Sequence, residues 1–112
     1  MTIGTELKTI RDLPLIELRG NITDADIEDL VNTMEPLLEG PHATVVIDIS
    51  AITFIGSFGL GKIVSYNARM RKAGRELVLV NTNPDPETFV ASMLKLTNLY
   101  KVLKIVTDPT AV

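Results

Sequence analysis

The chain has 112 residues, a formal net charge of −3 and no dense run of Lys or Arg, which argues against a nucleic-acid binder. It contains no cysteine and one histidine, which excludes disulfides, thiol chemistry and histidine-rich metal sites. A carboxylate metal site stays open but unsupported, and we expect no metal and no cofactor. With 46% hydrophobic and 22% charged residues, the composition favours an α/β or α+β protein.

The sequence contains no repeat, low-complexity tract or linker, so we expect residues 1–112 to form a single domain. Its core is expected over about 5–107, followed by a short loose tail. The amino terminus lacks the basic segment and apolar stretch of a secretory signal, and no run approaches the roughly 20 apolar residues that span a bilayer. We therefore expect a cytoplasmic protein without direct membrane insertion.

Hydrophobic periodicity predicts elements in the order β-β-α-β-α-β-α-β, which implies a mixed sheet whose later strands run parallel. The expected elements are two hairpin strands within 6–20, a helix within 21–40, a central strand at 43–50, a helix from Ser57 to about Lys72, a strand at 75–81, a helix within 84–99 and a last strand at 102–106. Ligands of such sheets meet the loops at the carboxyl ends of strands, which are expected at 20–24, 50–57 and 81–85.

Cap and breaker residues predict where the helices begin and end. Thr23 or Asp24 is expected to cap the first helix, and Gly40 followed by proline ends it. Pro36 lies inside this helix and is expected to kink or divide it. In the last helix, Pro86 is expected near the first turn.

Residues 55–62, which read IGSFGLGK, match the glycine and lysine spacing of a phosphate-binding loop. Such a loop needs a Ser or Thr after its lysine to hold magnesium, and here Ile63 follows Lys62. The candidate metal ligand, Asp48, belongs to the strand that precedes the loop rather than to another strand. Lys62 is instead expected on the solvent side of its helix, and the run gives only weak support to a nucleotide-binding enzyme.

A serine nucleophile is the second chemical interpretation of the same run. Gly59 follows Ser57 at the spacing of a nucleophile elbow, but Ile55 occupies the preceding glycine position. The one candidate base, His42, is expected in a turn and has no evident orienting acid. The simplest interpretation is that Ser57 caps its helix, its hydroxyl accepting a hydrogen bond from a backbone amide.

The run VVIDISAITFIGSFGLGKIVS, residues 45–65, resembles the STAS domain family, in particular bacterial anti-sigma factor antagonists. The family signature is a β-branched strand ending in Asp or Asn, a short segment, and then Asp-Ser-Ser/Thr-Gly-Leu-Gly opening a helix. The resemblance covers nearly the whole chain, including LRGNITD at 18–24, where the family has Gly-x-Leu-Asp, and the strand-helix-strand ending at 73–105. It implies an STAS-like α/β domain with a mixed sheet of four to five strands and helices packed against it.

The resemblance implies a binding protein and not an enzyme. In such antagonists the first serine after the acid, here Ser57, is phosphorylated by the anti-sigma factor, an ATP-dependent serine kinase, and a metal-dependent serine phosphatase reverses this. The unphosphorylated form occupies the anti-sigma factor, so that sigma factor is released to RNA polymerase, and the phosphorylated form dissociates. The residues carried over by position as partner-binding are Asn21, Thr23, Asp24, Gly56, Phe58, Gly59, Leu60 and Gly61.

Two positions depart from the family motif. Gly56 stands where the family has the acid before the phosphoacceptor, and Phe58 replaces the second Ser or Thr. If exposed, Phe58 is an aromatic anchor for a partner's pocket; otherwise it is a core contact. These departures leave open a second hypothesis, an STAS interaction module without phosphorylation, such as an accessory subunit of a membrane transporter or a scaffold component. The sequence does not indicate the oligomeric state.

Overall fold

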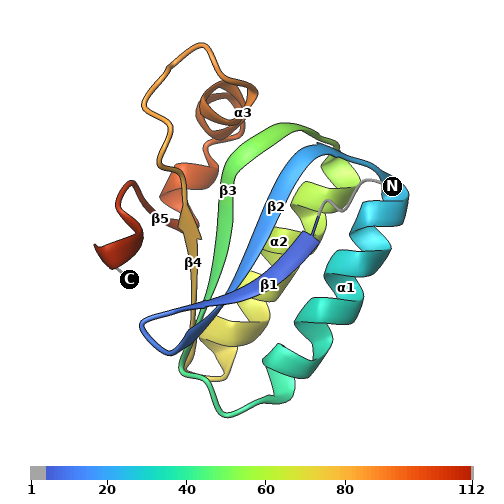
Figure 1. Ribbon diagram of the computed structural model, residues 1–112, viewed down its shortest axis with the longest axis vertical. Helices are drawn as coiled ribbons and strands as arrows, with labels where there is room; N and C mark the ends of the chain where they lie inside the picture. Colours follow the sequence, from blue (N-terminus) through green and yellow to red (C-terminus); the bar gives the residue numbers. More distant parts are fainter. Residues whose placement is uncertain (1–4, 112) are drawn as a thin grey trace.

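The computed structural model describes residues 5–111, which form one five-stranded mixed sheet and its covering helices (Figure 1). The elements are β1 (Thr5–Ile10), β2 (Leu13–Ile22), α1 (Asp24–Glu39), β3 (Thr44–Ile55), α2 (Ser57–Lys72), β4 (Glu76–Val80), α3 (Phe89–Thr97), the 3-10 turn η1 (Leu99–Lys101), β5 (Lys104–Val106) and the 3-10 turn η2 (Pro109–Ala111). The strand order is β1-β2-β3-β4-β5, with β1 antiparallel to β2 and every other pair parallel. The predicted element order and α/β class are confirmed.

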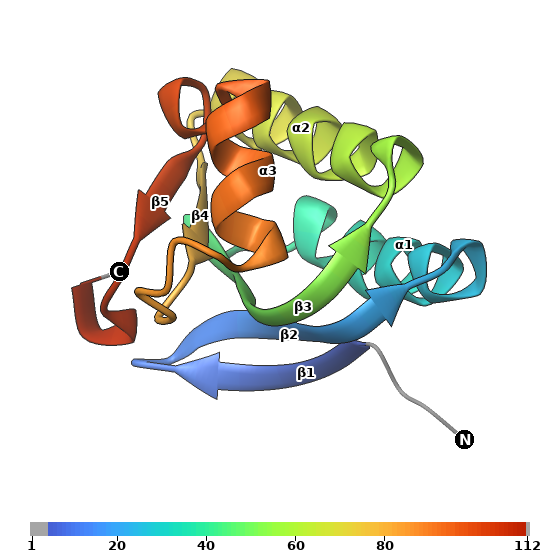
Figure 2. The same ribbon diagram turned by 90° about the horizontal axis from the view of Figure 1, so that it is seen from above.

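The three helices lie over the same face of the sheet (Figure 2). Between them and the strands is the main core, built almost entirely from Ile, Leu, Val and Met side chains. The opposite face has a small apolar cluster of Leu15, Val46 and Val80. The near-continuous apolar runs of β3 and β4 follow from this burial on both faces, since a central parallel strand has no water-facing side.

Helix α1 is a single 16-residue helix that continues through Pro36, so the expected division there is wrong. Proline removes the hydrogen bond to the carbonyl four residues earlier, which belongs to Asn32. Both Pro36 and Asn32 are exposed, so water can satisfy that carbonyl. The expected boundaries are confirmed, because Thr23 is the N-cap and Gly40 is the C-cap.

Two strands are longer than expected, and the last helix starts later. Strand β2 passes through Gly20 at φ +77°, beside an irregularity in its pairing, and ends at Ile22 instead of Gly20. Strand β3 continues to Ile55, so most of the expected loop at 50–57 is strand paired with β2. Helix α3 begins at Phe89, with Thr88 as its N-cap, and Pro86 lies in the preceding loop.

Arg75 links the C-terminus of α1 to the turn that precedes β3. Its guanidinium donates to the carbonyls of Leu37 (2.7 Å), Leu38 and His42 (2.6 Å). The first two carbonyls are at the C-terminus of α1, where the last turn leaves such groups unpaired. One side chain therefore satisfies the end of α1 and ties it to the turn before β3.

The tail that was expected to be loose contains η2, whose Thr110 carbonyl accepts a hydrogen bond from Arg11 in the β1–β2 turn.

Among residues 5–111, no helix has both the length and the apolarity needed to cross a membrane.

Candidate functional site

The candidate site lies at the end of the sheet where the C-termini of the neighbouring strands β2 and β3 lie side by side. Ile22 and Ile55 are paired in register at these two ends, and α1 and α2 start directly after them. The predicted residues from the two segments, 21–24 and 56–61, are therefore brought to the same edge of the molecule (Figure 1). Their meeting at one edge is a consequence of the parallel pairing.

Ser57 is the first residue of α2 and not its N-cap, so that expectation is wrong by one residue. Gly56 takes the cap position with extended backbone (φ −82°, ψ 176°), and its carbonyl accepts the first helical hydrogen bond from the amide of Leu60 at 3.0 Å. The cap position is thus filled by a residue with no side chain. Ser57 is exposed to solvent on the first turn.

The N-terminus of α2 is open to an anion. Gly56 supplies no side-chain hydrogen bond, and the first turn holds no acidic residue. The amides of the first turn have no partner within the helix, and the helix dipole places a partial positive charge of roughly half a unit there. The hydroxyl of Ser57 sits within this region of positive potential.

Phe58 is exposed over 60% of its surface, so the alternative of a core contact is wrong. The ammonium of Lys62, one turn further along α2, lies 5.6 Å from the centre of its ring. Lys62 is half-buried and lies beside this exposed ring. The pair makes a cation–π contact that holds an aromatic side chain beside Ser57.

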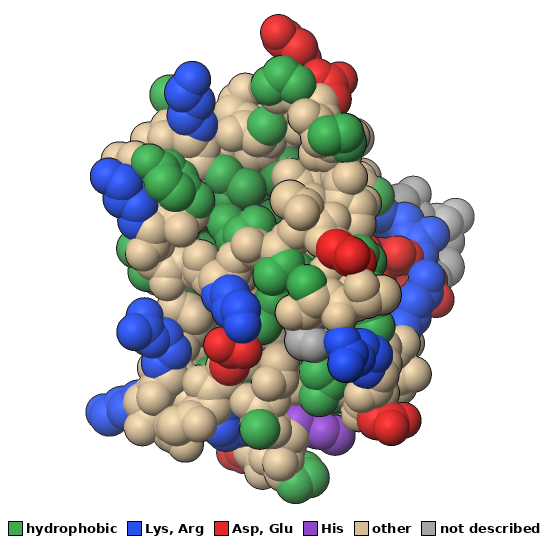
Figure 3. Space-filling model, turned by 90° about the vertical axis from the view of Figure 1, so that its left-hand side faces the viewer, with side chains coloured by type: hydrophobic (Ala, Val, Ile, Leu, Met, Phe, Trp, Pro, Cys, Tyr) green, Lys and Arg blue, Asp and Glu red, His purple; other side chains and the backbone are tan. Residues whose placement is uncertain are grey.

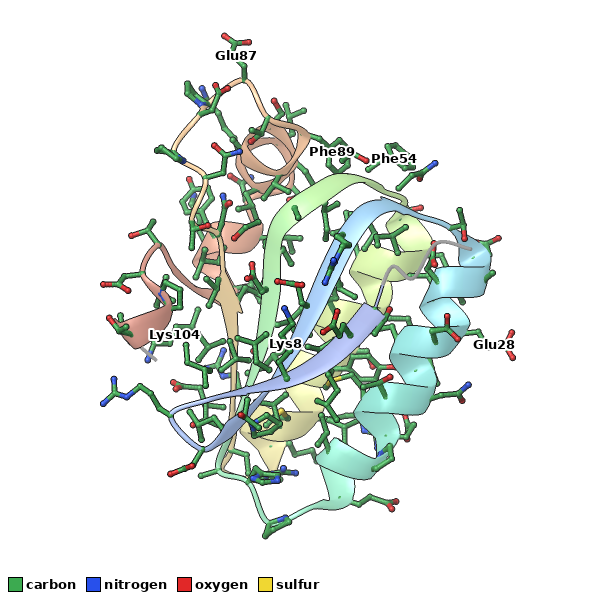
Figure 4. The ribbon with its side chains drawn as sticks, viewed as in Figure 1. Lys8, Glu28, Phe54, Glu87, Phe89 and Lys104 are labelled. Carbon is green, nitrogen blue, oxygen red and sulfur yellow. The ribbon has the colours of Figure 1, made fainter. Side chains whose placement is uncertain are left out.

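A second aromatic group, which sequence reasoning missed, lies next to Gly56. Phe54 is 50% exposed, and its ring centre is 5.1 Å from that of Phe89 at the start of α3. A Cβ at Gly56 would lie 3.9 Å from the Phe54 ring. Figure 4 shows Phe54 and Phe89 side by side above the end of β3. The exposed rings of Phe54 and Phe58 give this end of the sheet an apolar surface, next to the partly buried ring of Phe89.

The glycines after Ser57 have opposite environments. Gly59 is buried, and a Cβ there would lie 2.6 Å from Cδ1 of Ile27 and 2.7 Å from Cγ1 of Ile55. The absence of a side chain at Gly59 allows α2 to pack closely on α1 and β3. Because Gly59 is buried, it offers no exposed surface for the partner contact that was predicted for it. Gly61 is exposed, and the position that a methyl group would take there has no atom within 4 Å. Leu60 is half-buried against the core.

The predicted residues on the α1 side are exposed, but one of them has a structural task. Thr23 forms a capping box with Asp26: the amide of Asp26 donates to the Thr23 hydroxyl at 3.3 Å, and the Thr23 amide donates to the Asp26 carboxylate at 2.8 Å. Asp24 is exposed in the first turn, and Asn21 is exposed opposite Phe54 in the sheet register. Asp24 and Asn21 are therefore the freer candidates for contact with a partner.

The structure separates the residues that catalysis would need. His42 precedes β3 and Ser57 follows it, so the whole 12-residue strand lies between them. The Asp48 carboxylate accepts a hydrogen bond from the amide of Ser50 at 2.9 Å, within β3. Among residues 5–111, no cluster of three His, Cys, Asp or Glu side chains is placed to hold a metal ion.

A family model and several solved structures agree on the family and the fold of this chain. A family model described as "STAS domain" matches residues 5–110. An anti-sigma factor antagonist from Mycobacterium paratuberculosis has the same fold, with 20% identity over 96% of this chain and 87% of that chain and a TM-score of 0.78. The anti-sigma factor antagonist SpoIIAA in its unphosphorylated form is 16% identical over 91% of this chain and 86% of that one, with a TM-score of 0.70. The Bacillus cell fate determinant SpoIIAA in the phosphorylated form is 16% identical over 96% and 95% of the two chains, also with a TM-score of 0.70.

Proposed function

This chain belongs to the STAS domain family, and from that premise we propose that it is an anti-sigma factor antagonist switched off by phosphorylation of Ser57. The observation that carries the proposal is the position of Ser57, exposed on the first turn of a helix whose N-terminus has neither a side-chain cap nor an acid. The proposed role is that of a binding partner and kinase substrate, without a catalytic residue or cofactor of its own. Such a role belongs in the cytoplasm.

Helix α2 can accommodate a phosphate at Ser57 without rearrangement. The phosphate would be stabilised by the positive end of the helix dipole and by the unpaired amides of the first turn. The dense packing at Gly59 holds that turn in place. The unmodified and modified forms would therefore share one fold.

The phosphate would change what a partner meets at this edge. It adds about −1.5 to −2 charges and a strong hydration shell next to the exposed ring of Phe58. A partner that covers the ring must then desolvate the phosphate, which is costly unless the partner offers matching cations. Loss of binding follows from the cost of desolvating the phosphate beside the exposed ring.

The proposed partners follow from this cycle. An anti-sigma factor with serine-kinase activity binds the unmodified edge and phosphorylates Ser57, and a serine phosphatase restores the binding form. Competition for the anti-sigma factor is what would release sigma factor.

The proposal is tested by intact mass and peptide mapping of the protein isolated from its own cells and after incubation in native lysate with ATP. We expect one added phosphate on Ser57 in the wild type, none in Ser57→Ala, and no loss in Ser65→Ala, which removes an exposed serine further along the same helix. In pull-downs Ser57→Ala should retain the anti-sigma factor and Ser57→Asp should bind it at least tenfold more weakly. Equal affinity of both variants would contradict the switch.

A second function is favoured by Gly56 and by the exposure of Phe58. Gly56 occupies the position at which the family has an acid, and the exposed Phe58, a candidate aromatic anchor, lies two residues further on. This combination suits an STAS interaction module that binds constitutively, as a transporter accessory subunit or scaffold component. Absence of phosphate under every growth condition, together with pull-downs dominated by transporter ATPase subunits and lost in Phe58→Ala, would favour it.

A further inference from the structure

Part of one edge of strand β3 has no strand beside it. Strand β4 pairs only with Thr44–Asp48, while β3 continues to Ile55 along β2. After β4 the chain turns away: the amide of Asn81 donates to the carbonyl of Val106, and the amide of Thr82 donates to the side-chain oxygen of Ser50 at 2.8 Å. Within residues 5–111, the backbone groups of 51–54 that point away from β2 therefore have no neighbouring strand.

A groove runs along this edge. Its volume is about 370 Å³, within the range of ligand sites, and its walls come from β3 on one side and from the loop at 81–88 and the start of α3 on the other. The residues that line it are Ser50, Ala51, Ile52, Thr53, Asn83, Thr88 and Phe89. Ala51 and Thr53 are exposed, and Ile52 between them is buried.

This edge lacks the charged side chains and the proline that often block pairing at an exposed strand edge. Residues 49–61 contain no charged residue and no proline, and most of 49–55 is β-branched or aromatic. The edge strand β1, in contrast, carries Glu6 and Lys8, which form ion pairs with Arg19 and Glu17 of β2. An uncharged, unpaired edge in the same sheet as a charged one is available for pairing.

The surroundings of the groove define the chemistry of its occupant. The loop at 81–88 contains two acids, Asp85 and Glu87, both exposed, and no Lys or Arg. Figure 3 shows acidic side chains at the upper end of the molecule and Lys and Arg side chains along the left side of the same view, and Figure 4 places Glu87 at the tip of the loop. At the far end, the Phe54 and Phe89 rings offer an apolar contact. An extended backbone with a basic and an apolar side chain matches all three features.

We propose that the 51–54 edge of β3 binds an extended, basic segment of a partner protein by adding it as a further strand. Backbone hydrogen bonds supply the affinity, and the acidic loop and the Phe54–Phe89 pair select the side chains. The inference goes beyond the proposed function, since it needs neither a kinase nor a phosphate. The edge nevertheless adjoins Gly56, so one partner can contact both the groove and the start of α2.

The test uses the full chain and a random heptapeptide display library. We expect enrichment of peptides that combine Lys or Arg with β-branched residues. The enriched peptides are then synthesised with N-methyl groups on alternate backbone amides. Methylation of the set of amides that faces β3 should weaken binding at least tenfold, and methylation of the other set should have little effect. Their binding should shift the NMR amide signals of 51–54 and of Phe89. The assay contains no anti-sigma factor, so its result is independent of the proposed switch.

Charge reversal supplies the matched controls. Glu87→Lys should weaken the peptides at least fivefold, whereas Glu39→Lys, an exposed reversal at the opposite end of the molecule, should leave binding unchanged. The proposal is overturned if no peptide is enriched, if methylation has no effect in either register, or if the shifted signals lie outside the groove. Concentration-dependent dimers that pair through the same edge would overturn the assigned occupant in favour of a second copy of this chain.

Discussion

Helices α1 and α2 start at the ends of adjacent parallel strands, yet their first turns are built in opposite ways. Thr23 and Asp26 close a capping box on α1, and Asp24 and Asp26 place two acids against its dipole. Helix α2 starts from Gly56, with no side-chain cap and no acid in its first turn. Both helices follow the ends of paired parallel strands, so the difference between their first turns comes from the side chains alone.

The difference shows where the sequence departs from the locally most stable choice. Relative to glycine, a side-chain cap contributes only roughly a few tenths of a kcal/mol, and an acid in the first turn contributes roughly 0.3–1 kcal/mol. Helix α1 has both contributions and α2 has neither. Departures of this kind are expected at functional positions, and here the departure surrounds an exposed serine.

The largest effect is expected from breaking the packing that fixes the two helix starts together. Gly59→Ala forces a methyl group against Ile27 and Ile55, so the free energy of unfolding should fall by about 2 kcal/mol. Urea denaturation followed by circular dichroism measures this change. The control is Gly61→Ala, where space is open and removal of a helical glycine should raise stability by roughly 0.5–1 kcal/mol. Similar effects at both glycines would refute the assigned packing role.

Removing the cap of α1 should make its first turn more like that of α2, with Asp24 and Asp26 still in place. Thr23→Ala deletes the acceptor for the Asp26 amide and should lower the free energy of unfolding by about 1 kcal/mol. Amide hydrogen exchange should locate the loss in the first turn of α1. Thr23→Ser, which keeps the hydroxyl, should retain most of the stability; an equal loss in both variants would point to the methyl group instead.

Adding a cap to α2 makes the comparison from the other side and should have the smallest effect. Gly56→Asp supplies an acceptor and a negative charge, so thermal unfolding should show a gain of about 0.5 kcal/mol at low salt that declines in roughly 1 M salt. Gly56→Asn is the neutral control and should gain less, with little salt dependence. No gain in either variant would mean that the open amides are already satisfied.

Sequence patterns predicted the order of the α-helices and strands because each of them has its own apolar periodicity. They missed features that only long-range pairing decides. Residues 51–55 of β3 are held as strand by β2, about 30 residues earlier in the chain, and the contact between Phe54 and Phe89 joins two separate elements. Ser57 was predicted at the start of α2 and lies there, but its place after the cap depended on the backbone of Gly56.

The tight fit at Gly59 has a consequence for how such a switch can be observed. With the first turn of α2 wedged against its neighbours, the proposed modification would alter what the surface carries and leave its shape unchanged. Fluorescent labels on α1 and α2 would report the same separation in both states, while ion-exchange chromatography would resolve them at once. A cell using this protein would be reading a charge and not a movement.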